Sequence, residues 1–272
     1  MSELRVHHLN CAHIQRMSLG GLPLACHVLL VETPNSGLVL VDTGLGTADY
    51  RAISSRLGRG FALGYAKPEV DPALAAIAQV EGMGFDPRDV RHIVQTHLDL
   101  DHVGGLSDFP WAAVHVHELE LEAAMARRGV RARGRYRPAM WAHRPNWKVY
   151  SEEGEDWFGF GAVRQLADLP SEILAVPLFG HTHGHCGIAI ETAGGWIFDA
   201  GDSFFDPREI HGSRRVCAPK VRLFQAVVTT DKPQRVANQA RLRAFVVGHP
   251  EVDVFAAHDP TYSGFRPDIS TV

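Results

Sequence analysis

Short apolar runs separated by turn-forming residues recur along the chain and predict β-strands. Residues 25–32 (ACHVLLVE) and 36–42 (SGLVLVD) are two such runs, and the segment between them has the composition of a tight turn. We expect these two segments to pair as a hairpin. The same pattern predicts further strands at 91–96, 112–116, 173–177, 187–191 and 195–199, and a last strand that ends at His258.

Apolar residues at helical spacing predict a helix at 72–81, where Asp71 is a candidate N-cap ahead of a proline. A second helix is expected at 118–128 and a third from about 234 to 247. The segment 129–160 follows neither period and is rich in Arg, Trp, Pro and Gly. We expect a loop-rich insertion there that covers a functional site, because long loops in compact domains often do so.

The alternation of strands with helices, without an internal repeat, predicts an α/β fold with two mixed sheets and helices packed outside them. The chain has 272 residues, and 45% of them are apolar, which is enough for a substantial core. We therefore expect a single domain over residues 1–272 that includes the insertion.

Charge and cysteine content narrow the class of protein. The net charge of −4 gives no general attraction to nucleic acid, and no segment approaches the roughly 20 apolar residues of a membrane helix. The four cysteines form no CxxC pair, and the first residues contain no apolar signal core. We expect a cytoplasmic protein that binds neither nucleic acid nor a membrane and acts on a small molecule.

One strongly basic stretch departs from this balance, the segment from Arg127 to Arg137 (RRGVRARGRYR). Its simplest interpretation is a solvated loop or helix face. The alternative is a basic patch that steers an anionic substrate toward the site.

Residue types that bind metal ions gather in four places, each just after a predicted strand. In chain order they are His97, Asp99, Asp101 and His102; His181, His183 and His185; Asp199 and Asp202; and His258. Hydrolytic metal sites need imidazoles and carboxylates that converge from several strand ends. The four clusters therefore predict one metal site in a shared cleft.

The order of these clusters resembles the metallo-β-lactamase-fold hydrolases over most of the chain. The family signature is an HxHxDH motif, then a His in a GHTxGH context, then an Asp and a His. The matching positions here are 97–102, His181, Asp202 and His258, and VDTG at 41–44 matches the family's first motif. The resemblance implies a four-layer αββα sandwich of two mixed β-sheets flanked by helices, with the site at one edge between the sheets.

The resemblance also implies two metal ions per chain, zinc by default. The first ion would be bound by His97, Asp99 and His181, and the second by Asp101, His102 and His258. Asp202 would bind both ions. Asp42 would orient ligands without binding metal. His183 and His185 are expected to fix loops or line the pocket.

The implied chemistry is hydrolysis by a metal-bound hydroxide, with Asp101 as the catalytic residue that orients it and passes a proton to the leaving group. The lactonase and glyoxalase II branches of the family favour a small ester or lactone as substrate. A glyoxalase II-like thioesterase or a phosphodiesterase could use the same core. An iron-binding oxidoreductase and a non-catalytic metal-binding module are alternatives of another class.

Asp99 departs from the family pattern, which most often has His at this position. Asp99 could still bind metal, it could fall short and leave one well-held ion, or the site could be non-catalytic. An additional carboxylate lowers the net charge of the site, and oxygen ligands favour iron or manganese relative to imidazole. The flavodiiron branch of the fold has a carboxylate at this position and binds iron, so iron and manganese both remain alternatives to zinc.

Similar lactonases often place a Tyr close to the Asp that matches Asp202, where it assists the carbonyl oxygen. In this chain Phe204 and Phe205 follow Asp202 instead, and no Tyr matches. These two aromatic residues are candidate walls of the site.

Overall fold

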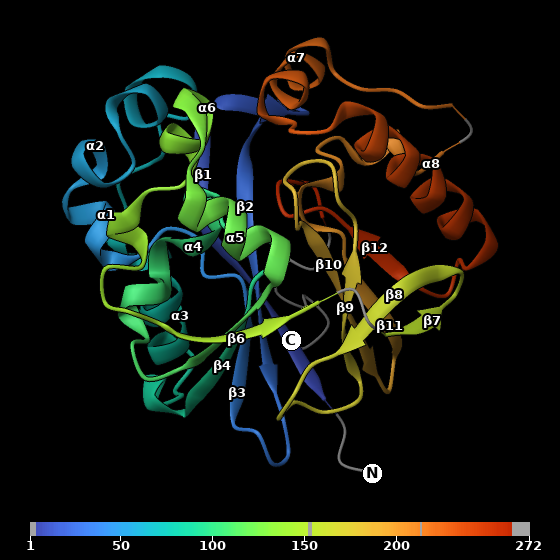
Figure 1. The fold of residues 1–272 in the computed structure, drawn as a ribbon, viewed down its shortest axis with the longest axis horizontal. Coiled ribbons are helices and arrows are strands. Elements are labelled where there is room, and N and C mark those ends of the chain that lie inside the picture. Colours follow the sequence, from blue (N-terminus) through green and yellow to red (C-terminus); the bar gives the residue numbers. More distant parts are fainter. Residues whose placement is uncertain (1–3, 152–153, 213, 263–272) are drawn as a thin grey trace, which may run out of the picture.

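The computed structural model describes residues 4–151, 154–212 and 214–262, and two facing β-sheets form its centre. Each sheet has six strands. Figure 1 shows the sheets running through the middle of the molecule with helices on either side.

The first sheet joins an antiparallel part to a parallel part. Strands β1, β2 and β3 pair antiparallel, and the pairs from β3 to β6 are parallel. The hairpin predicted from residues 25–42 is present, because β2 pairs directly with β3. The strands are, in spatial order, β1 (Arg5–Leu19), β2 (Leu22–Glu32), β3 (Leu38–Val41), β4 (Val90–Val94), β5 (Ala113–His117) and β6 (Asn146–Tyr150).

The second sheet is largely antiparallel, and only β11 and β12 pair parallel. Both sheets are therefore mixed, as the sequence predicts. The strands are, in spatial order, β12 (Asp253–Phe255), β11 (Gly195–Asp199), β10 (Cys186–Thr192), β9 (Ile173–Pro177), β8 (Phe160–Gln165) and β7 (Glu155–Trp157).

Alternating side chains divide the core into three apolar clusters. In β2, Val28 and Leu30 face an outer cluster shared with helices, whereas Leu29 packs in an inner cluster with Ile188 of β10. A third cluster lies on the far side of the second sheet, where Leu242 of α8 packs. Apolar layers on both faces of each sheet give the four-layer αββα sandwich that the family resemblance implies.

Eight α-helices and several single turns connect the strands within the described residues. The α-helices are α1 (Thr47–Arg51), α2 (Ile53–Arg56), α3 (Ala76–Gly82), α4 (Leu100–Val103), α5 (Glu118–Ala126), α6 (Gly129–Arg135), α7 (Pro219–Val228) and α8 (Lys232–Gly248). The short turns are the π-helical η1 (Gly60–Tyr65) and the 3-10 turns η2 (Pro72–Leu74), η3 (Pro87–Asp89), η4 (Gly104–Asp108), η5 (Pro138–Met140), η6 (Gly201–Ser203) and η7 (Pro207–Glu209).

The helix predicted at 72–81 is interrupted, because Ala75 has an extended ψ of 137° that separates η2 from α3. The Asp71 side chain does cap this segment and accepts a hydrogen bond from the Ala73 N–H at 3.0 Å. The predicted cap is therefore confirmed, and the predicted continuous helix is wrong.

The loop-rich character expected of residues 129–160 is wrong for much of that segment, which contains α6, η5, β6 and β7. Helix α6 buries none of its residues, and β6 buries only Tyr150. Regular structure with so few buried positions leaves almost no apolar period in the sequence.

Within the described residues, no helix combines the length and the apolar character that crossing a membrane requires.

Candidate metal centre

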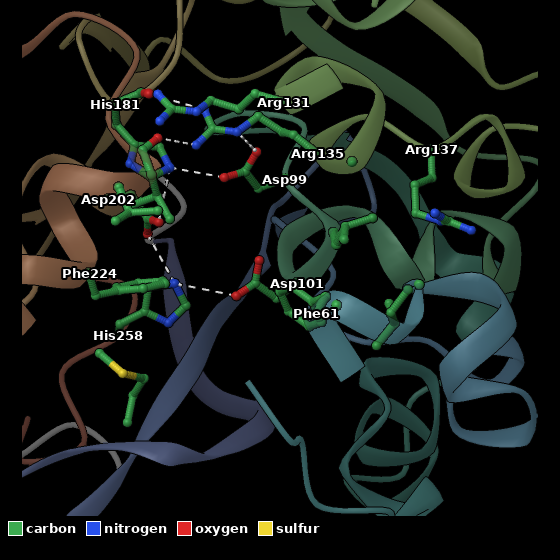
Figure 2. Close-up of a pocket in the computed structure, with 18 of the residues that line it drawn as sticks. Phe61, Asp99, Asp101, Arg131, Arg135, Arg137, His181, Asp202, Phe224 and His258 are labelled. Atoms are coloured by element: carbon green, nitrogen blue, oxygen red, sulfur yellow. Dashed lines mark hydrogen bonds and ion pairs between the residues drawn. The ribbon is translucent and has the colours of Figure 1, made fainter. Parts of the chain in front are cut away.

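A cavity of about 710 Å³ opens where the strand ends of both sheets meet (Figure 2). Its floor carries five of the residues that the sequence singles out: Asp99, Asp101, His181, Asp202 and His258. An apolar wall comes from α7 and from the segment around η1, through Leu57, Phe61, Leu223, Phe224, Val227 and Val228. Basic side chains, Arg59, Arg131, Arg135, Arg137 and Lys220, also line it.

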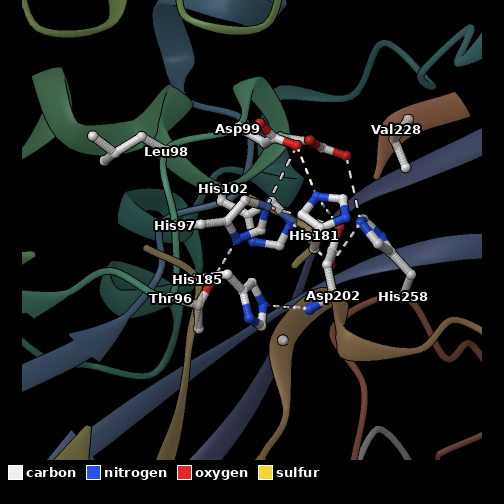
Figure 3. Close-up of polar contacts among 12 residues, drawn as sticks. Thr96, His97, Leu98, Asp99, His102, His181, His185, Asp202, Val228 and His258 are labelled. Carbon is white, nitrogen blue, oxygen red and sulfur yellow. Dashed lines mark hydrogen bonds and ion pairs between the residues drawn. The ribbon is translucent and has the colours of Figure 1, made fainter. Parts of the chain in front are cut away.

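The structure brings all seven predicted ligand residues together, although they come from distant parts of the chain (Figures 2 and 3). Each lies in or beside a short segment that follows a strand end. His97 follows β4, Asp99 immediately precedes α4, Asp101 and His102 lie within α4, His181 follows β9, Asp202 lies in η6 after β11, and His258 follows β12.

The first group of candidate ligands contains His97, Asp99, His181 and Asp202, whose ligand atoms lie within 4.8 Å of one another. The Nε2 atom of His181 is 3.0 Å from Asp99 Oδ2 and 3.3 Å from Asp202 Oδ2. The Nε2 atom of His97 is 3.5 Å and 3.8 Å from the same two oxygens. Asp99 therefore reaches the group, despite its side chain being shorter than that of His.

The second group contains His102, Asp202 and His258, with Asp101 beside it. Asp202 Oδ1 is 3.4 Å from His102 Nε2 and 3.3 Å from His258 Nε2. Asp101 Oδ2 lies 3.6 Å from His258 Nε2. The two oxygens of Asp202 thus face different groups, Oδ2 the first and Oδ1 the second.

The spacing of these atoms fits metal ions. Zinc–nitrogen and zinc–oxygen bonds of about 2.0–2.1 Å in a tetrahedron place neighbouring ligand atoms about 3.3 Å apart. The histidine–aspartate separations given above run from 3.0 to 3.8 Å. Among the described residues, His97 Nε2, His102 Nε2 and Asp202 Oδ1 are buried without a hydrogen-bond partner. Buried polar atoms normally have partners, so the convergence of these three atoms fits the binding of a cation.

The opposite nitrogens of three imidazoles are anchored to protein oxygens. His102 Nδ1 lies 2.7 Å from Asp42 Oδ2, and His97 Nδ1 lies 3.0 Å from Thr96 Oγ1. His258 Nδ1 donates to the Ala25 carbonyl at 2.6 Å. Since a carbonyl can only accept, the Nδ1 of His258 carries a proton, so the neutral ring would direct its Nε2 lone pair into the cavity.

Asp42 is fully buried and orients the motif that follows β4. It accepts hydrogen bonds from the Thr96 N–H at 2.8 Å and the Thr96 hydroxyl at 2.6 Å, in addition to its contact with His102. Its φ of 58° lies in the left-handed region, which Asp adopts more readily than most residues. This geometry matches the predicted role of Asp42 as a residue that orients a ligand.

Two glycines allow the close approaches that shape the centre. A Cβ atom on Gly104 would lie 2.0 Å from Asp49 Oδ2, so only glycine lets α4 pack against the 42–49 segment. Gly201 has a φ of +54°, and a Cβ atom there would lie 2.5 Å from His185 Nε2.

His185 and His183 behave differently from each other. The Nε2 atom of His185 accepts a hydrogen bond from the Asp202 N–H at 2.9 Å, so His185 fixes a loop, one of the two roles expected for it from the sequence. Burial lowers the pKa of His185 to about 3, which keeps the ring neutral and able to accept. His183 is exposed and lines a neighbouring cavity.

Glu120 was not singled out from the sequence, yet it connects the two loops that bear His97 and His181. It is fully buried in α5. Its Oε1 accepts from the Leu98 N–H at 3.0 Å and from the Tyr136 hydroxyl at 3.1 Å, and its Oε2 accepts from the Gly184 N–H at 3.1 Å. Nothing in its sequence context, an alternation of Glu with Leu, distinguishes it from an exposed helical residue.

Cys26 and Arg135 are two further residues that the sequence did not place here. The Cys26 thiol lies with Asp101 and His258 in a third group of ligand atoms within 4.8 Å. The guanidinium of Arg135 faces Asp99, with 3.1 Å between Nε and Oδ1. Burial alone would raise the pKa of Asp99, but the Arg135 guanidinium and the His97 imidazole hold it well below its usual range.

The candidate wall residues Phe204 and Phe205 lie behind the ligands and not in the cavity. Both are fully buried, and the ring of Phe205 stacks on the imidazole of His258 with centroids 5.0 Å apart. None of the described residues that line the cavity is a tyrosine.

The basic segment 127–137 partly faces the cavity. Arg137 lines it but donates to the carbonyls of Arg56 and Ser55, at 2.5 Å and 2.9 Å. Figure 2 shows Arg135 directed at Asp99, whereas Arg137 lies apart from the ligands. Arg131 is exposed at the cavity. Two of these three arginines are thus bound to protein groups.

The fold and the site together define a metallo-hydrolase. A model of the metallo-beta-lactamase superfamily matches residues 21–249, which is most of the chain. The chain belongs to the metallo-β-lactamase superfamily. Probable metallo-hydrolases of Mycobacterium tuberculosis and Mycobacterium bovis are each 39% identical to it over 260 residues, which cover 94% of this chain and 81% of theirs.

More distant similarities lead to lactonases. An N-acyl homoserine lactonase of Agrobacterium fabrum is 31% identical over 121 residues, 43% of this chain and 42% of that protein. The structure of a Bacillus thuringiensis AiiA variant with bound N-decanoyl-L-homoserine superposes with a TM-score of 0.70 at 20% identity, covering 96% of this chain and 95% of that one. AidC, a dizinc quorum-quenching lactonase, superposes with a TM-score of 0.57 at 17% identity, covering 95% and 85%. At such identities these structures establish the shared fold.

Proposed function

We propose that the chain is a dinuclear zinc hydrolase that cleaves a small ester or lactone. The observation that carries this proposal is the orientation of Asp202, whose Oδ2 faces one ligand group and whose Oδ1 faces the other. A carboxylate divided between two groups in this way suits a bridged two-metal site. In this proposal His97, Asp99 and His181 bind one ion, Asp101, His102 and His258 bind the second, and Asp202 binds both.

Two bound ions would supply an activated water at neutral pH and a Lewis acid for the substrate carbonyl. Asp101 lies on the cavity floor and would orient that water. Burial raises the pKa of Asp101 in the metal-free chain, and as a carboxylate it could accept a proton from that water and pass it to the leaving oxygen. Asp101 is therefore the proposed proton-transfer residue.

The cavity supports a substrate with an apolar part. Its wall of Leu, Phe and Val side chains faces the ligand floor, so an acyl group would lie on the wall while the scissile carbonyl reaches the floor. The named activity of similar proteins, N-acyl homoserine lactone hydrolysis, supports the same class of substrate. No described cavity residue offers a phenol to the carbonyl oxygen.

Metal content and a substrate screen test the proposal. Protein purified without added metal should contain two zinc ions per chain and should hydrolyse an acyl lactone or an aryl ester. At saturating zinc, Asp101→Asn should lower kcat by about 10²- to 10⁴-fold because proton transfer is lost. Glu122→Gln, an exposed change on α5, is the control and should leave kcat unchanged.

Other outcomes would select other activities. Turnover of thioesters or phosphodiesters alone would replace the ester and lactone assignment. Phosphodiesters are tested because exposed Arg131 and Lys220 line the cavity. Stoichiometric iron or manganese would overturn the zinc assignment. Full metal occupancy without turnover of any substrate would favour a metal-binding module.

A further inference from the structure

The guanidinium of Arg135 is fixed by three elements around the metal centre. Its Nε forms the ion pair with Asp99 Oδ1, its Nη1 donates to the His181 carbonyl at 3.1 Å, and its Nη2 donates to the Val228 carbonyl. Nη1 also lies 3.3 Å from the Thr230 hydroxyl. Only 10% of the Arg135 side chain is exposed. All three guanidinium nitrogens are thus engaged by protein groups, so Arg135 is poorly placed to bind a substrate anion.

The two oxygens of Asp99 have different partners. Oδ1 faces Arg135, whereas Oδ2 faces the Nε2 atoms of His181 and His97, at 3.0 Å and 3.5 Å. The carboxylate therefore presents one oxygen to the ligand group and keeps the other in an ion pair. A single ligand atom at this position is also what a histidine would present.

The summed charge of Asp99 and Arg135 also matches that of a neutral histidine. Asp99 adds one negative charge to the group where a neutral imidazole would add none. Arg135 adds one positive charge 3.1 Å away, in a pair that is shielded from solvent. The sum of the two residues is zero, which equals the charge of the imidazole.

We propose that Asp99 and Arg135 form one unit that replaces a histidine ligand, in which Arg135 is a positioning residue that orients the Asp99 carboxylate and cancels its charge. The inference rests on the proposed metal site, and it explains how Asp can occupy this position in a zinc hydrolase. The unit depends on the planar fork of arginine, because three nitrogens must reach groups on three elements at once.

Zinc affinity in a set of four chains tests the unit: wild type, Arg135→Gln, Asp99→His and the double variant. Zinc dissociation constants are measured by chelator competition, and cobalt(II) spectra report the ligand geometry. Arg135→Gln should weaken zinc binding by about 10- to 100-fold, as loss of a group that orients a ligand does. Asp99→His should weaken it comparably, because Arg135 then lies unpaired beside two cations.

The double variant decides the outcome, because a histidine without the arginine recreates the usual site. It should bind zinc at least tenfold more tightly than Asp99→His alone, so the two changes should be strongly non-additive. Arg131→Gln on the same helix removes an exposed arginine from the same cavity and should change neither the affinity nor the spectrum. Arg135→Lys keeps the charge but not the fork, and should give an intermediate affinity.

A double variant that binds zinc no better than Asp99→His would overturn the unit while leaving the proposed hydrolase intact, provided the wild type holds two zinc ions. A wild-type chain that binds no zinc would overturn both. Circular dichroism of the metal-free variants establishes whether each is folded. If Arg135→Gln is not folded, Arg135→Lys replaces it in the comparison.

Discussion

Glu120 shows how much a single residue outside the ligand set contributes to the centre. Its carboxylate receives hydrogen bonds from the loop after β4, from the loop after β9 and from Tyr136, which follows α6. A Cβ atom on Gly184 would lie 2.8 Å from the Cβ of Glu120, so the loop is also packed closely against it. One buried acceptor thereby sets the separation of the two loops that carry His97 and His181.

Replacing Glu120 with Ala should lower the free energy of unfolding by roughly 3 kcal/mol or more, because three buried donors would lose their acceptor at about 1–3 kcal/mol each. Urea denaturation of the metal-free protein measures the change. Glu122→Ala, an exposed position on the same helix, should stay within about 0.5 kcal/mol of the wild type. Equal stability of the two variants would show that water replaces Glu120 as the acceptor.

The seven candidate ligands could be predicted because each belongs to a motif with a fixed local spacing, and their role as ligands stays a prediction. Arg135 and Glu120 could not, because each acts through partners far away in the sequence. Arg135 lies among several arginines of the same segment, and only its position beside Asp99 sets it apart. Ion pairs of this kind depend on the tertiary fold and leave no local pattern.

At the scale of elements, α7 contributes more to the cavity than to the core. Leu223 is 68% exposed and Val227 55% exposed, yet both line the cavity, while Val221 on the same helix is fully buried. An exposed apolar face beside a polar floor is expected where a ligand covers it. Helix α7 is therefore the element on which acyl-chain preference should depend.

Leu223→Asp should lower kcat/KM for long acyl substrates by roughly 10-fold or more and for short ones by much less, because a longer chain would cover more of the apolar wall that α7 provides. A loss of 1.4 kcal/mol of apolar contact corresponds to tenfold. Val247→Asp on α8 is a matched control, since Val247 is 78% exposed and does not line the cavity. An equal loss for long and short substrates would remove α7 from the binding surface.

The pattern of apolar residues predicted most of the buried strands but not β1. Strand β1 has 15 residues, and its pairing with β2 shifts register between Asn10 and His13 and again between Ile14 and Ser18. Each shift moves the buried positions to the other parity, so the strict alternation that marks a strand is lost. The register shifts therefore leave β1 a long strand in the structure but remove the regular alternation of apolar residues from its sequence.

At the scale of the whole molecule, several histidines are buried away from the metal centre. Burial lowers the pKa of His8, His115 and His117 to about 4 each. In the unfolded chain these groups have pKa values near 6.5. The unfolded state therefore binds more protons than the folded state between pH 6.5 and 4.

Stability of the metal-free protein should fall as pH decreases through this window, by on the order of 1–3 kcal/mol for each histidine. Urea denaturation at a series of pH values, with chelator present, measures the slope. His117→Asn should reduce that slope while retaining stability at pH 8, because His117 caps α5 by accepting from the Leu119 N–H and Asn is a good N-cap. An unchanged slope would mean that His117 is not a source of the acid sensitivity.

The layers of the fold could be predicted from family resemblance, whereas the apolar pattern alone indicates only two mixed sheets with helices outside. Which sheet edge carries the site depends on how strand ends from both halves of the chain meet. The relative position of the two sheets depends on packing in the inner cluster, which contains both Leu29 of the first sheet and Ile188 of the second.

The split orientation of Asp202 has a consequence for biosynthesis. His102 is contributed by the first half of the chain and His258 by a segment near its end, and Asp202 faces both. During synthesis the early motif emerges with four potential ligands of its own, yet the shared carboxylate is added only after β11 and the last imidazole only after β12. If the proposed two-metal site is correct, full loading with metal should mark the end of folding, and a chelator pulse during refolding would time it.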